Sequence, residues 1–203
     1  MQRSHQKRAT ALLWLTFLQA CGGGGDDTAS ANAPATTSNA PTAPAAAAST
    51  PSGAAPATDT TCGLSNFEAD ALRLINQYRA AGATCGSHGA FAPSAALTRN
   101  AKLASAAFGH SRDMADNNYF SHDSQDGRTM ANRIDATGYT WSTIGENIAA
   151  GYSSVQSVIE GWMASEGHCA NLMNPRFTEF GMACARNDAS TYRLYWTQDF
   201  GRP

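Results

Sequence analysis

The first candidate for chemistry in this chain is a carboxylate, Glu146, in an apolar, strand-like run. Glu146 alternates with Ile144 and Ile148, and a period of two places the three side chains on one face of a strand. A carboxylate on an apolar face costs free energy unless a partner stabilises its charge or it stays protonated. The pattern predicts a functional carboxylate or, if the strand is bulged, a solvated one.

A histidine further along the chain is the second candidate. The residues over 154–166 carry an apolar stripe with helical spacing, and a serine just before the stripe can cap the helix. Gly167 is expected to end this helix in a left-handed conformation, which places His168 at the helix C-terminus. Such a position stabilises the charged imidazole by up to about 2 kcal/mol. It suits a ligand, an acid–base group or a plain capping residue.

Three further histidines lie in the part of the chain that is expected to fold. His110 falls in the buried stripe of a helix predicted over 98–117, where a core or supporting role is expected. Ser111 does not form a triad with it, because neighbouring residues on a helix point about 100° apart. His88 lies in a glycine-rich loop and is expected to be exposed. His122 follows the helix and is the third candidate for the site.

The elements that must position these residues do not alternate strictly between helix and strand. An α+β layered fold is therefore expected rather than a βαβ arrangement. A capping box at Ser65 begins a first helix, which Gly82 closes. Further helices are predicted over 98–117, 129–137 and 154–166, and strands over 144–149, 180–185 and 192–198.

Five motifs in this order resemble the bacterial branch of the CAP superfamily, which comprises cysteine-rich secretory, antigen 5 and pathogenesis-related 1 proteins. They are Asn76–Arg79, Tyr119–His122, Gly145–Asn147, Trp162 with Gly167-His168, and Tyr195–Gly201. The resemblance covers about residues 65–201. It implies a three-layer α-β-α sandwich with a mostly antiparallel central sheet.

The resemblance also implies a central cleft lined by two histidines and two acidic residues. His122, Glu146 and His168 match three of these positions. The fourth position falls on Ser165, and the acidic residue next to it is Glu166, which joins the candidate set if it turns inward. The candidate cleft aromatics are Tyr119, Phe120, Tyr139, Trp141 and Trp162, of which Trp162 is expected to belong to the core instead.

Two imidazoles and one carboxylate resemble an open zinc site with water in the fourth position. His122, Glu146 and His168 are the candidate ligands, and such a water can act as a nucleophile. Their spacing matches no local metal motif, so only the family fold brings them together. The alternative is a polar cluster in which Glu146 orients both histidines.

The cysteines indicate an exported, disulfide-bonded domain. Without Cys21, the even set of Cys62, Cys85, Cys169 and Cys184 predicts two disulfides in one of three connectivities. A bond between Cys62 and Cys85 leaves almost no slack, because the helix between them spans about 27 Å. Proteins resembling this chain often carry cysteines at the Cys85 and Cys169 positions. The resemblance therefore favours Cys85–Cys169 with Cys62–Cys184.

The N-terminus is typical of an export signal. A basic segment precedes an apolar run over 9–18, which is shorter than the about 20 residues needed to span a bilayer. The following Leu18–Cys21 resembles a lipoprotein box, which implies cleavage after residue 20 and lipid attachment at Cys21. The alternative is an ordinary secretory signal with an incidental cysteine. Gly22 after the cysteine favours the outer membrane in a cell with two membranes.

The remaining chain divides into a linker and a folded domain. Residues 21–61 are rich in Ala, Pro, Thr and Ser and are predicted to form a disordered spacer between the lipid anchor and the domain. The CAP domain is assigned to residues 62–203. The net charge of −2 gives no basic surface for nucleic acid, and a monomer is expected.

Two functions are consistent with these residues. The favoured one is a non-enzymatic binding module that holds a small amphipathic molecule, a cation or an envelope component such as a lipid or polymer. The alternative is a zinc-assisted hydrolase of peptides or envelope polymers, with His122 and His168 as zinc ligands and Glu146 as a ligand or general base. The absence of a nucleophile motif favours the first, and a fold alone does not fix a function.

Overall fold

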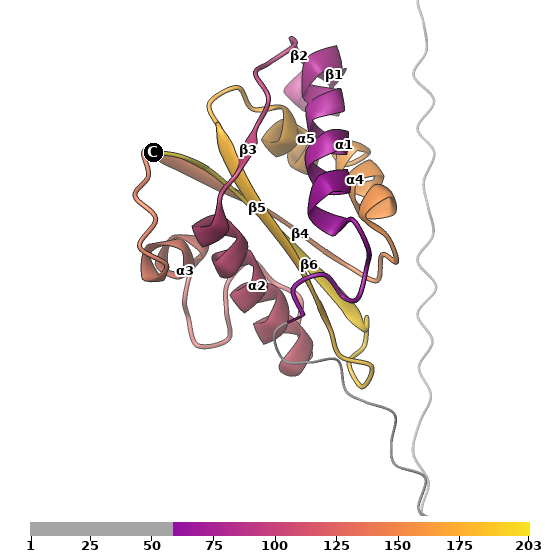
Figure 1. Cartoon of the computed structure of the whole chain (residues 1–203), viewed down its shortest axis with the longest axis vertical. Helices are drawn as coiled ribbons and strands as arrows, with labels where there is room; N and C mark the ends of the chain where they lie inside the picture. Colours follow the sequence, from indigo (N-terminus) through magenta and orange to yellow (C-terminus); the bar gives the residue numbers. More distant parts are fainter. Residues whose placement is uncertain (1–58) are drawn as a thin grey trace, which may run out of the picture. The chain divides into compact units, whose positions relative to one another are not determined.

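The computed structural model describes residues 59–203, so the predicted signal, Cys21 and the linker up to residue 58 lie outside the described residues. Within this part, a four-stranded sheet is covered by helices on both faces (Figure 1). The expected α+β sandwich of three layers is therefore confirmed. No helix within 59–203 is long and apolar enough to cross a bilayer.

The helices and strands of the described part follow one another along the chain. The helices are α1 (Phe67–Ala81), the short 3-10 helix η1 (Gly86–His88), α2 (Ala101–Asp116), α3 (Met130–Ala136), α4 (Val155–Met163) and α5 (Glu166–Met173). The strands are β1 (Ala83–Thr84), β2 (Ala90–Phe91), β3 (Thr98–Arg99), β4 (Thr143–Ala150), β5 (Glu179–Arg186) and β6 (Leu194–Arg202).

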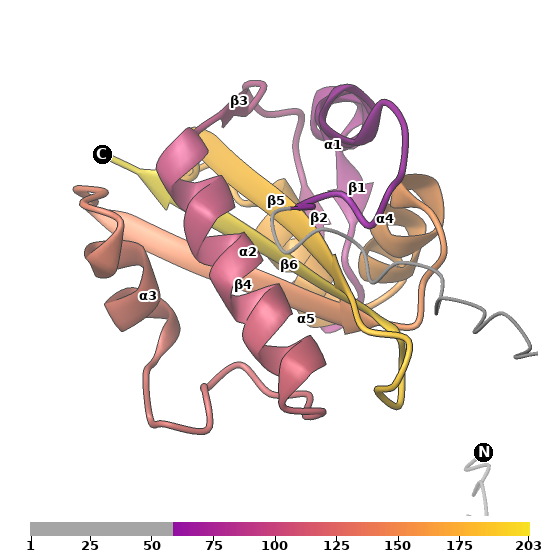
Figure 2. The same cartoon turned by 60° about the horizontal axis from the view of Figure 1, so that its bottom comes forward.

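The central sheet has the strand order β3-β5-β6-β4, which places β4 at one edge. The β4–β6 and β5–β6 pairs are antiparallel, and only the short β3–β5 pair is parallel. In Figure 2, α2 lies across one face of the sheet, and α1 and α4 lie on the opposite side. The expected mostly antiparallel sheet is confirmed.

Local capping explains where three of the helices begin. The Asn100 side chain accepts backbone hydrogen bonds at the start of α2, and Thr129 and Ser154 form capping boxes at α3 and α4. The capping box predicted at Ser65 is wrong. The chain enters α1 through Asn66 in a left-handed conformation with φ 55°, which asparagine tolerates well.

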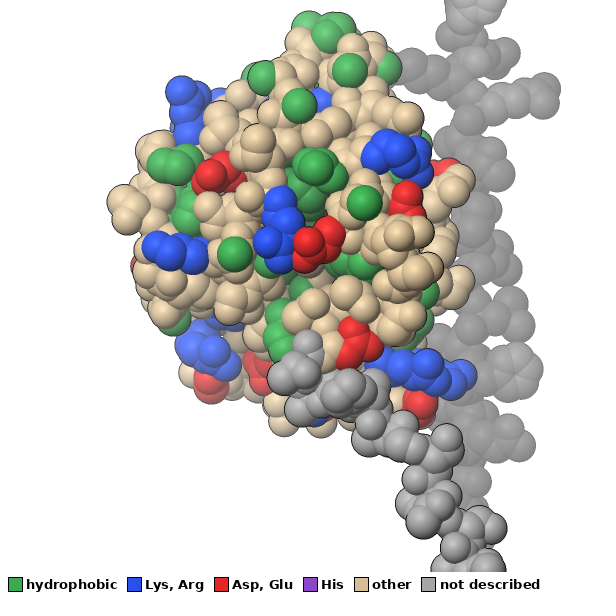
Figure 3. All heavy atoms as spheres, viewed as in Figure 1, with side chains coloured by type: hydrophobic (Ala, Val, Ile, Leu, Met, Phe, Trp, Pro, Cys, Tyr) green, Lys and Arg blue, Asp and Glu red, His purple; other side chains and the backbone are tan. Residues whose placement is uncertain are grey.

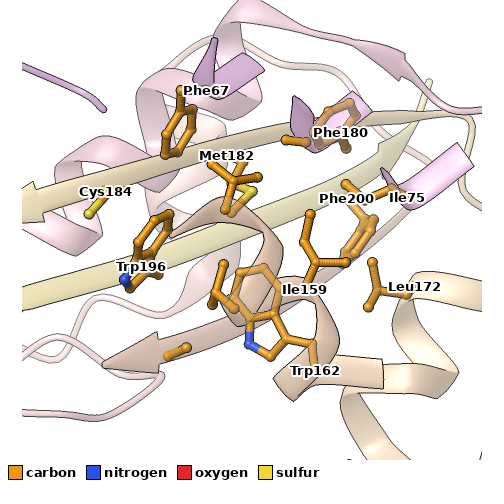
Figure 4. Packing of buried hydrophobic residues seen from close by; sticks show 14 of the residues in the cluster. Phe67, Ile75, Ile159, Trp162, Leu172, Phe180, Met182, Cys184, Trp196 and Phe200 are labelled. Atoms are coloured by element: carbon orange, nitrogen blue, oxygen red, sulfur yellow. The ribbon is translucent and has the colours of Figure 1, made fainter. Parts of the chain in front are cut away.

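The largest hydrophobic cluster lies between the sheet and the layer of α1, α4 and α5 (Figure 4). Phe67 from α1 stacks on Trp196 of β6, with ring centroids 5.7 Å apart. Phe177 stacks on Phe200 at 5.1 Å, and Trp162 of α4 is 2% exposed. Burial of each such side chain contributes about 1.5–3 kcal/mol, so this layer is firmly attached to the sheet.

The opposite face of the sheet receives α2 at unusually close range. A Cβ atom built on Gly181 of β5 would lie 1.9 Å from the backbone nitrogen of Ala104 in α2. Only glycine permits this approach of backbone to backbone. This contact sets how closely α2, and the segment that follows it, lies to β4 and β6.

The helix predicted over 154–166 is in fact two helices. The α4 helix ends at Met163, and α5 begins at Glu166 after a tight turn in which the Ser165 N–H bonds to the Trp162 carbonyl. Gly167 therefore lies inside α5 rather than acting as a left-handed cap. His168 lies in the first turn of α5, so the predicted position at a helix C-terminus is wrong.

Both disulfides favoured by the resemblance are present. Cys62 bonds to Cys184 with Cα atoms 5.4 Å apart, and Cys85 bonds to Cys169 at 5.5 Å. The Cys184 N–H also bonds to the Thr60 carbonyl. The chain is therefore attached to β5 slightly before the predicted domain boundary at residue 62.

Candidate functional site

The Glu146 carboxylate lies on the face of β4 that carries Ile144 and Ile148, as the alternation predicts. Its side chain is 2% exposed and its charge is fully partnered. Oε1 accepts a hydrogen bond from His122 Nδ1 at 2.8 Å, and Oε2 accepts one from the Arg133 guanidinium at 2.6 Å. Burial alone would raise the pKa of Glu146, but these two partners outweigh it and the pKa is lowered.

Arg133 is a site residue that the sequence reasoning missed. It projects from α3, its side chain is 4% exposed, and it also donates to the Ser124 hydroxyl and the Arg128 carbonyl. A buried arginine needs a buried acceptor with a charge, and Glu146 provides it. The segment between α2 and α3 thus reaches the sheet through both His122 and Arg133.

Asp199 is a second buried carboxyl group, directly beside the first. It lies opposite Glu146 in the β4–β6 register, is 1% exposed, and has no hydrogen-bond partner for either oxygen within residues 59–203. Burial, followed by the neighbouring Glu146 charge, raises the pKa of Asp199 well above its ordinary value. With Asp199 neutral, Arg133 balances the charge of the one remaining carboxylate.

Only the family motif covered this residue in the sequence. Asp199 lies within the Tyr195–Gly201 motif, one residue beyond the strand predicted over 192–198. Its position opposite Glu146 depends on the strand register, which the local sequence does not specify.

His110 holds the segment that carries His122. The buried His110 side chain on α2 donates from Nε2 to the Ser121 carbonyl at 2.9 Å. Burial lowers the pKa of His110, which favours the neutral form. It acts as a support for the site, which is the role expected from its place in the helix stripe.

His168 reaches the site from the other side of β4. The Asn147 side chain donates to the His168 carbonyl at 3.3 Å and accepts a bond from Asn171 at 3.0 Å. The His168 ring is half-buried, and burial followed by the nearby His122 lowers its pKa. Within the described residues it forms no hydrogen bond with Glu146, so Glu146 orients one histidine rather than both.

Glu166 lies outside the cleft. Its exposed side chain accepts a hydrogen bond from the Ser87 hydroxyl near the Cys85–Cys169 disulfide. It borders none of the cavities beside His122 and His168. The second acidic residue of the cluster is instead Asp199.

Three adjoining cavities form a cleft along this region, and we call them the first, second and third cavity. The first, about 350 Å³, lies between His122 and the start of α3 and also borders Glu146. The second, about 340 Å³, shares His122 with the first and extends to His168. The third, about 300 Å³, shares His168 with the second and is lined by Phe120, Ile148, Tyr152, Trp162 and Tyr192 among others.

Of the candidate cleft aromatics, Phe120 and Trp162 border the cleft. Tyr139 and Trp141 do not, because Tyr139 bonds to Glu179 and Trp141 bonds to Asp135. Tyr119 is likewise absent from the three walls. Two aromatics that were not expected, Tyr152 and Tyr192, take their place.

The predicted zinc ligands do not fit a three-ligand metal site. Within residues 59–203, no group of three or more His, Cys, Asp or Glu side chains is arranged to hold a metal ion. Each Glu146 oxygen already accepts a bond from His122 or Arg133. A guanidinium 2.6 Å from the carboxylate also opposes a divalent cation there.

The arrangement of motif residues on this fold agrees with a comparison against family models. The model of the cysteine-rich secretory protein family, CAP, matches residues 72–200. The chain belongs to the CAP family. The match includes every residue of the candidate site described above.

Curated relatives support the same family over a shorter stretch. The chain is 39% identical over 97 residues to the membrane protein YlbC and 37% identical over 98 residues to the protein YkwD, both from Bacillus subtilis. Each match covers 48% of this chain. The matched stretch spans only 26% and 36% of the two relatives, so their other parts have no counterpart in the alignment.

Solved structures agree with the fold. An extracellular protein with an SCP domain from Bacillus anthracis is 34% identical, with a TM-score of 0.52 over 67% of this chain and 41% of its own. An outer surface protein from Borrelia burgdorferi is 17% identical, with a TM-score of 0.51 over 66% of this chain and 92% of its own. The second likeness concerns the fold alone.

Proposed function

We propose that this CAP protein is an extracytoplasmic binding module whose cleft holds a small amphipathic ligand. The observation that carries the proposal is the chemistry of the cleft, which is polar at one end and aromatic at the other. Ligand sites commonly combine apolar walls with a few fixed polar groups. The polar end and the aromatic end of the cleft both lie along the free edge of β4.

The polar end presents an oriented imidazole. Because His122 donates from Nδ1 to Glu146, its Nε2 remains free to accept a hydrogen bond when the ring is neutral. The His122 side chain is 56% exposed, so a ligand can reach it. Glu146 and His110 hold the ring and its segment in place, which lowers the entropy cost of binding.

The aromatic end exposes three large rings to solvent. Phe120 is 46% exposed, Tyr192 is 48% exposed and Tyr152 is 36% exposed. Phe120 and Tyr192 pack edge to face with centroids 6.0 Å apart, so they form a shaped wall. Grouped exposed apolar side chains are typical of binding surfaces.

The export signal and the relatives support the proposed location. The lipoprotein box at Cys21 would anchor the protein to the bacterial envelope, and the outer membrane is favoured if the cell has two membranes. The solved relative from Bacillus anthracis is described as extracellular, and YlbC is described as a membrane protein. The segment before residue 59 would place the domain away from the membrane.

Hydrolysis is not part of the proposal. It requires a metal-bound water on His122, Glu146 and His168, and the placement of these residues does not form that site. The zinc-assisted alternative therefore has no supporting observation in the described part of the chain.

The test is binding of an uncharged fluorescent probe, N-phenyl-1-naphthylamine, to the purified protein. Phe120→Ala should weaken binding about two- to tenfold, because an aromatic contact contributes about 0.5–1.5 kcal/mol beyond its buried area. Trp141→Ala is the matched control, since Trp141 is 37% exposed but lies outside the cleft. Equal losses in both variants, or no binding, would contradict the proposal.

A further inference from the structure

Among the described residues, the walls of the cleft carry the charge of Asp123 and neither a lysine nor an arginine. Among the described residues that border the three cavities, the only carboxylates are Asp123 and Glu146, and none is Lys or Arg. Arg133 lies behind Glu146 with its side chain 4% exposed, and its charge is balanced there. The cleft therefore offers no cation to an anionic ligand.

The two cleft histidines present ring nitrogens to a ligand. Burial lowers the pKa of His168, which keeps its ring neutral. His122 uses its Nδ1 hydrogen for Glu146, so its interaction with a ligand is through Nε2. An incoming group therefore meets ring nitrogens and the Asp123 carboxylate.

Asp123 is the carboxylate that a ligand can contact. It is exposed and borders both the first and the second cavity. Its backbone N–H donates to the Ser121 hydroxyl at 3.2 Å, which fixes the turn. Within residues 59–203 its side chain forms no ion pair, unlike Asp126 on the same segment, which pairs with Arg128.

Aromatic rings continue from this carboxylate into the third cavity. Phe120 borders the second and third cavities, and Tyr152 and Tyr192 border the third. The face of an aromatic ring attracts a cation, and this attraction adds to that of a nearby carboxylate. Ile148 provides an apolar floor between these groups.

We propose that the ligand of this cleft is an organic cation that carries an apolar chain. Its ammonium group lies between Asp123 and Phe120, and its chain lies over Ile148 toward Tyr152 and Tyr192. This inference rests on the proposed function and names the ligand class for the same site. An uncharged ligand would cover Asp123 without a compensating charge, which is unfavourable.

The test compares three probes that share an octyl chain and differ only in the head group. Octyltrimethylammonium, octyl glucoside and octyl sulfate are titrated into the full-length protein by calorimetry, below their micelle concentrations. Octyltrimethylammonium should bind most tightly and octyl sulfate least. The preference for the cation should weaken at high salt, because salt screens the attraction to Asp123.

Two variants distinguish binding in the cleft from binding elsewhere on the surface. Asp123→Asn should weaken binding of the cation about two- to fivefold, as expected for one exposed charge pair, and should leave octyl glucoside unchanged. Asp116→Asn makes the same chemical change at an exposed position on α2 outside the cleft and should have no effect. Both variants alter the surface, so both should fold.

The outcomes distinguish this inference from the proposed function. If octyl glucoside or octyl sulfate binds as tightly as the cation, or if Asp123→Asn has no effect on cation binding, the inference is wrong but the cleft still binds amphipathic molecules. If none of the three probes binds at millimolar concentration, the proposed function fails as well.

Discussion

At the scale of single residues, the site is a balance of buried charges. Glu146 and Arg133 form a buried ion pair, Asp199 is the neighbouring acid, and the exposed His122 donates a hydrogen bond to Glu146. One guanidinium can balance only one of two adjacent carboxyl groups. The raised pKa of Asp199 and the lowered pKa of Glu146 are the consequence.

Removing Arg133 should destabilise the protein, because the buried Glu146 carboxylate loses its cation. Arg133→Met leaves Glu146 buried without its cation and should lower the free energy of unfolding by about 3–5 kcal/mol. Urea denaturation at neutral pH measures the loss. Arg128→Met is the control, because Arg128 is 52% exposed and its pairs contribute about 1 kcal/mol or less. Similar losses in the two variants would show that the Glu146–Arg133 pair is not a buried ion pair.

Asp199 should make stability depend on pH in a defined direction. An unfolded aspartate loses its proton near pH 3.9, whereas the raised pKa keeps native Asp199 protonated. Its contribution is therefore complete below about pH 3.9 and is lost as pH rises toward the native pKa. Asp199→Asn keeps a hydrogen-bond donor without this titration.

The free energy of unfolding of Asp199→Asn, minus that of the natural protein, should increase with pH by up to about 1.4 kcal/mol per unit above pH 4. Urea denaturation at several pH values up to neutrality measures this difference. A constant or falling difference would mean that native Asp199 is ionised.

At the scale of elements, the free edge of β4 is held by side chains from the helical layer. Asn171 of α5 donates to the Glu146 carbonyl at 3.1 Å, and Trp162 of α4 donates to the Ile148 carbonyl at 3.1 Å. These bonds satisfy backbone acceptors that a further strand would otherwise pair. They also fix the distance between His168 on α5 and Glu146 on β4.

A buried arginine joins α1 to the segment after α5. Arg79 is 1% exposed and donates to the backbone carbonyls of Ala95, Leu172, Asn174 and Phe177. These bonds give a structural reason for Arg79 as the last residue of the Asn76–Arg79 motif. The planar guanidinium has five donors in a fixed fork, and lysine cannot reproduce that geometry.

Arg79→Lys should therefore lower the free energy of unfolding by about 2–3 kcal/mol, because buried carbonyls lose their donors. The midpoint of urea denaturation reports the change. Arg73→Lys, on the exposed side of the same helix with its side chain 53% exposed, should change stability by about 0.5 kcal/mol or less. Equal losses of stability in Arg79→Lys and Arg73→Lys would show that the Arg79 guanidinium does not have this structural role.

At the scale of the whole molecule, the two disulfides join residues that are far apart in the sequence. Cys62–Cys184 joins residues 122 positions apart, and Cys85–Cys169 joins residues 84 positions apart. The second bond holds the residue next to His168. On the face seen in Figure 3, positive and negative side chains are interspersed.

Much of the architecture was predictable because it depends on neighbouring residues. Alternation gave the strands around Glu146 and in the last third of the chain, and helical stripes gave α1 to α4 within a few residues. The break between Met163 and Glu166 was missed, because the alanine and serine there do not interrupt a helical pattern. The short strands β1, β2 and β3 were missed because strands of two residues carry no period.

By itself, the sequence determined the family, the layer architecture, the even set of cysteines and the importance of Glu146. Only the tertiary structure decided which partners Glu146 has and that its acidic neighbour is Asp199 rather than Glu166. It also decided that His168 begins a helix. The physical reason is range: periodicity and capping depend on adjacent residues, whereas a buried charge selects partners from distant elements that only the fold brings together.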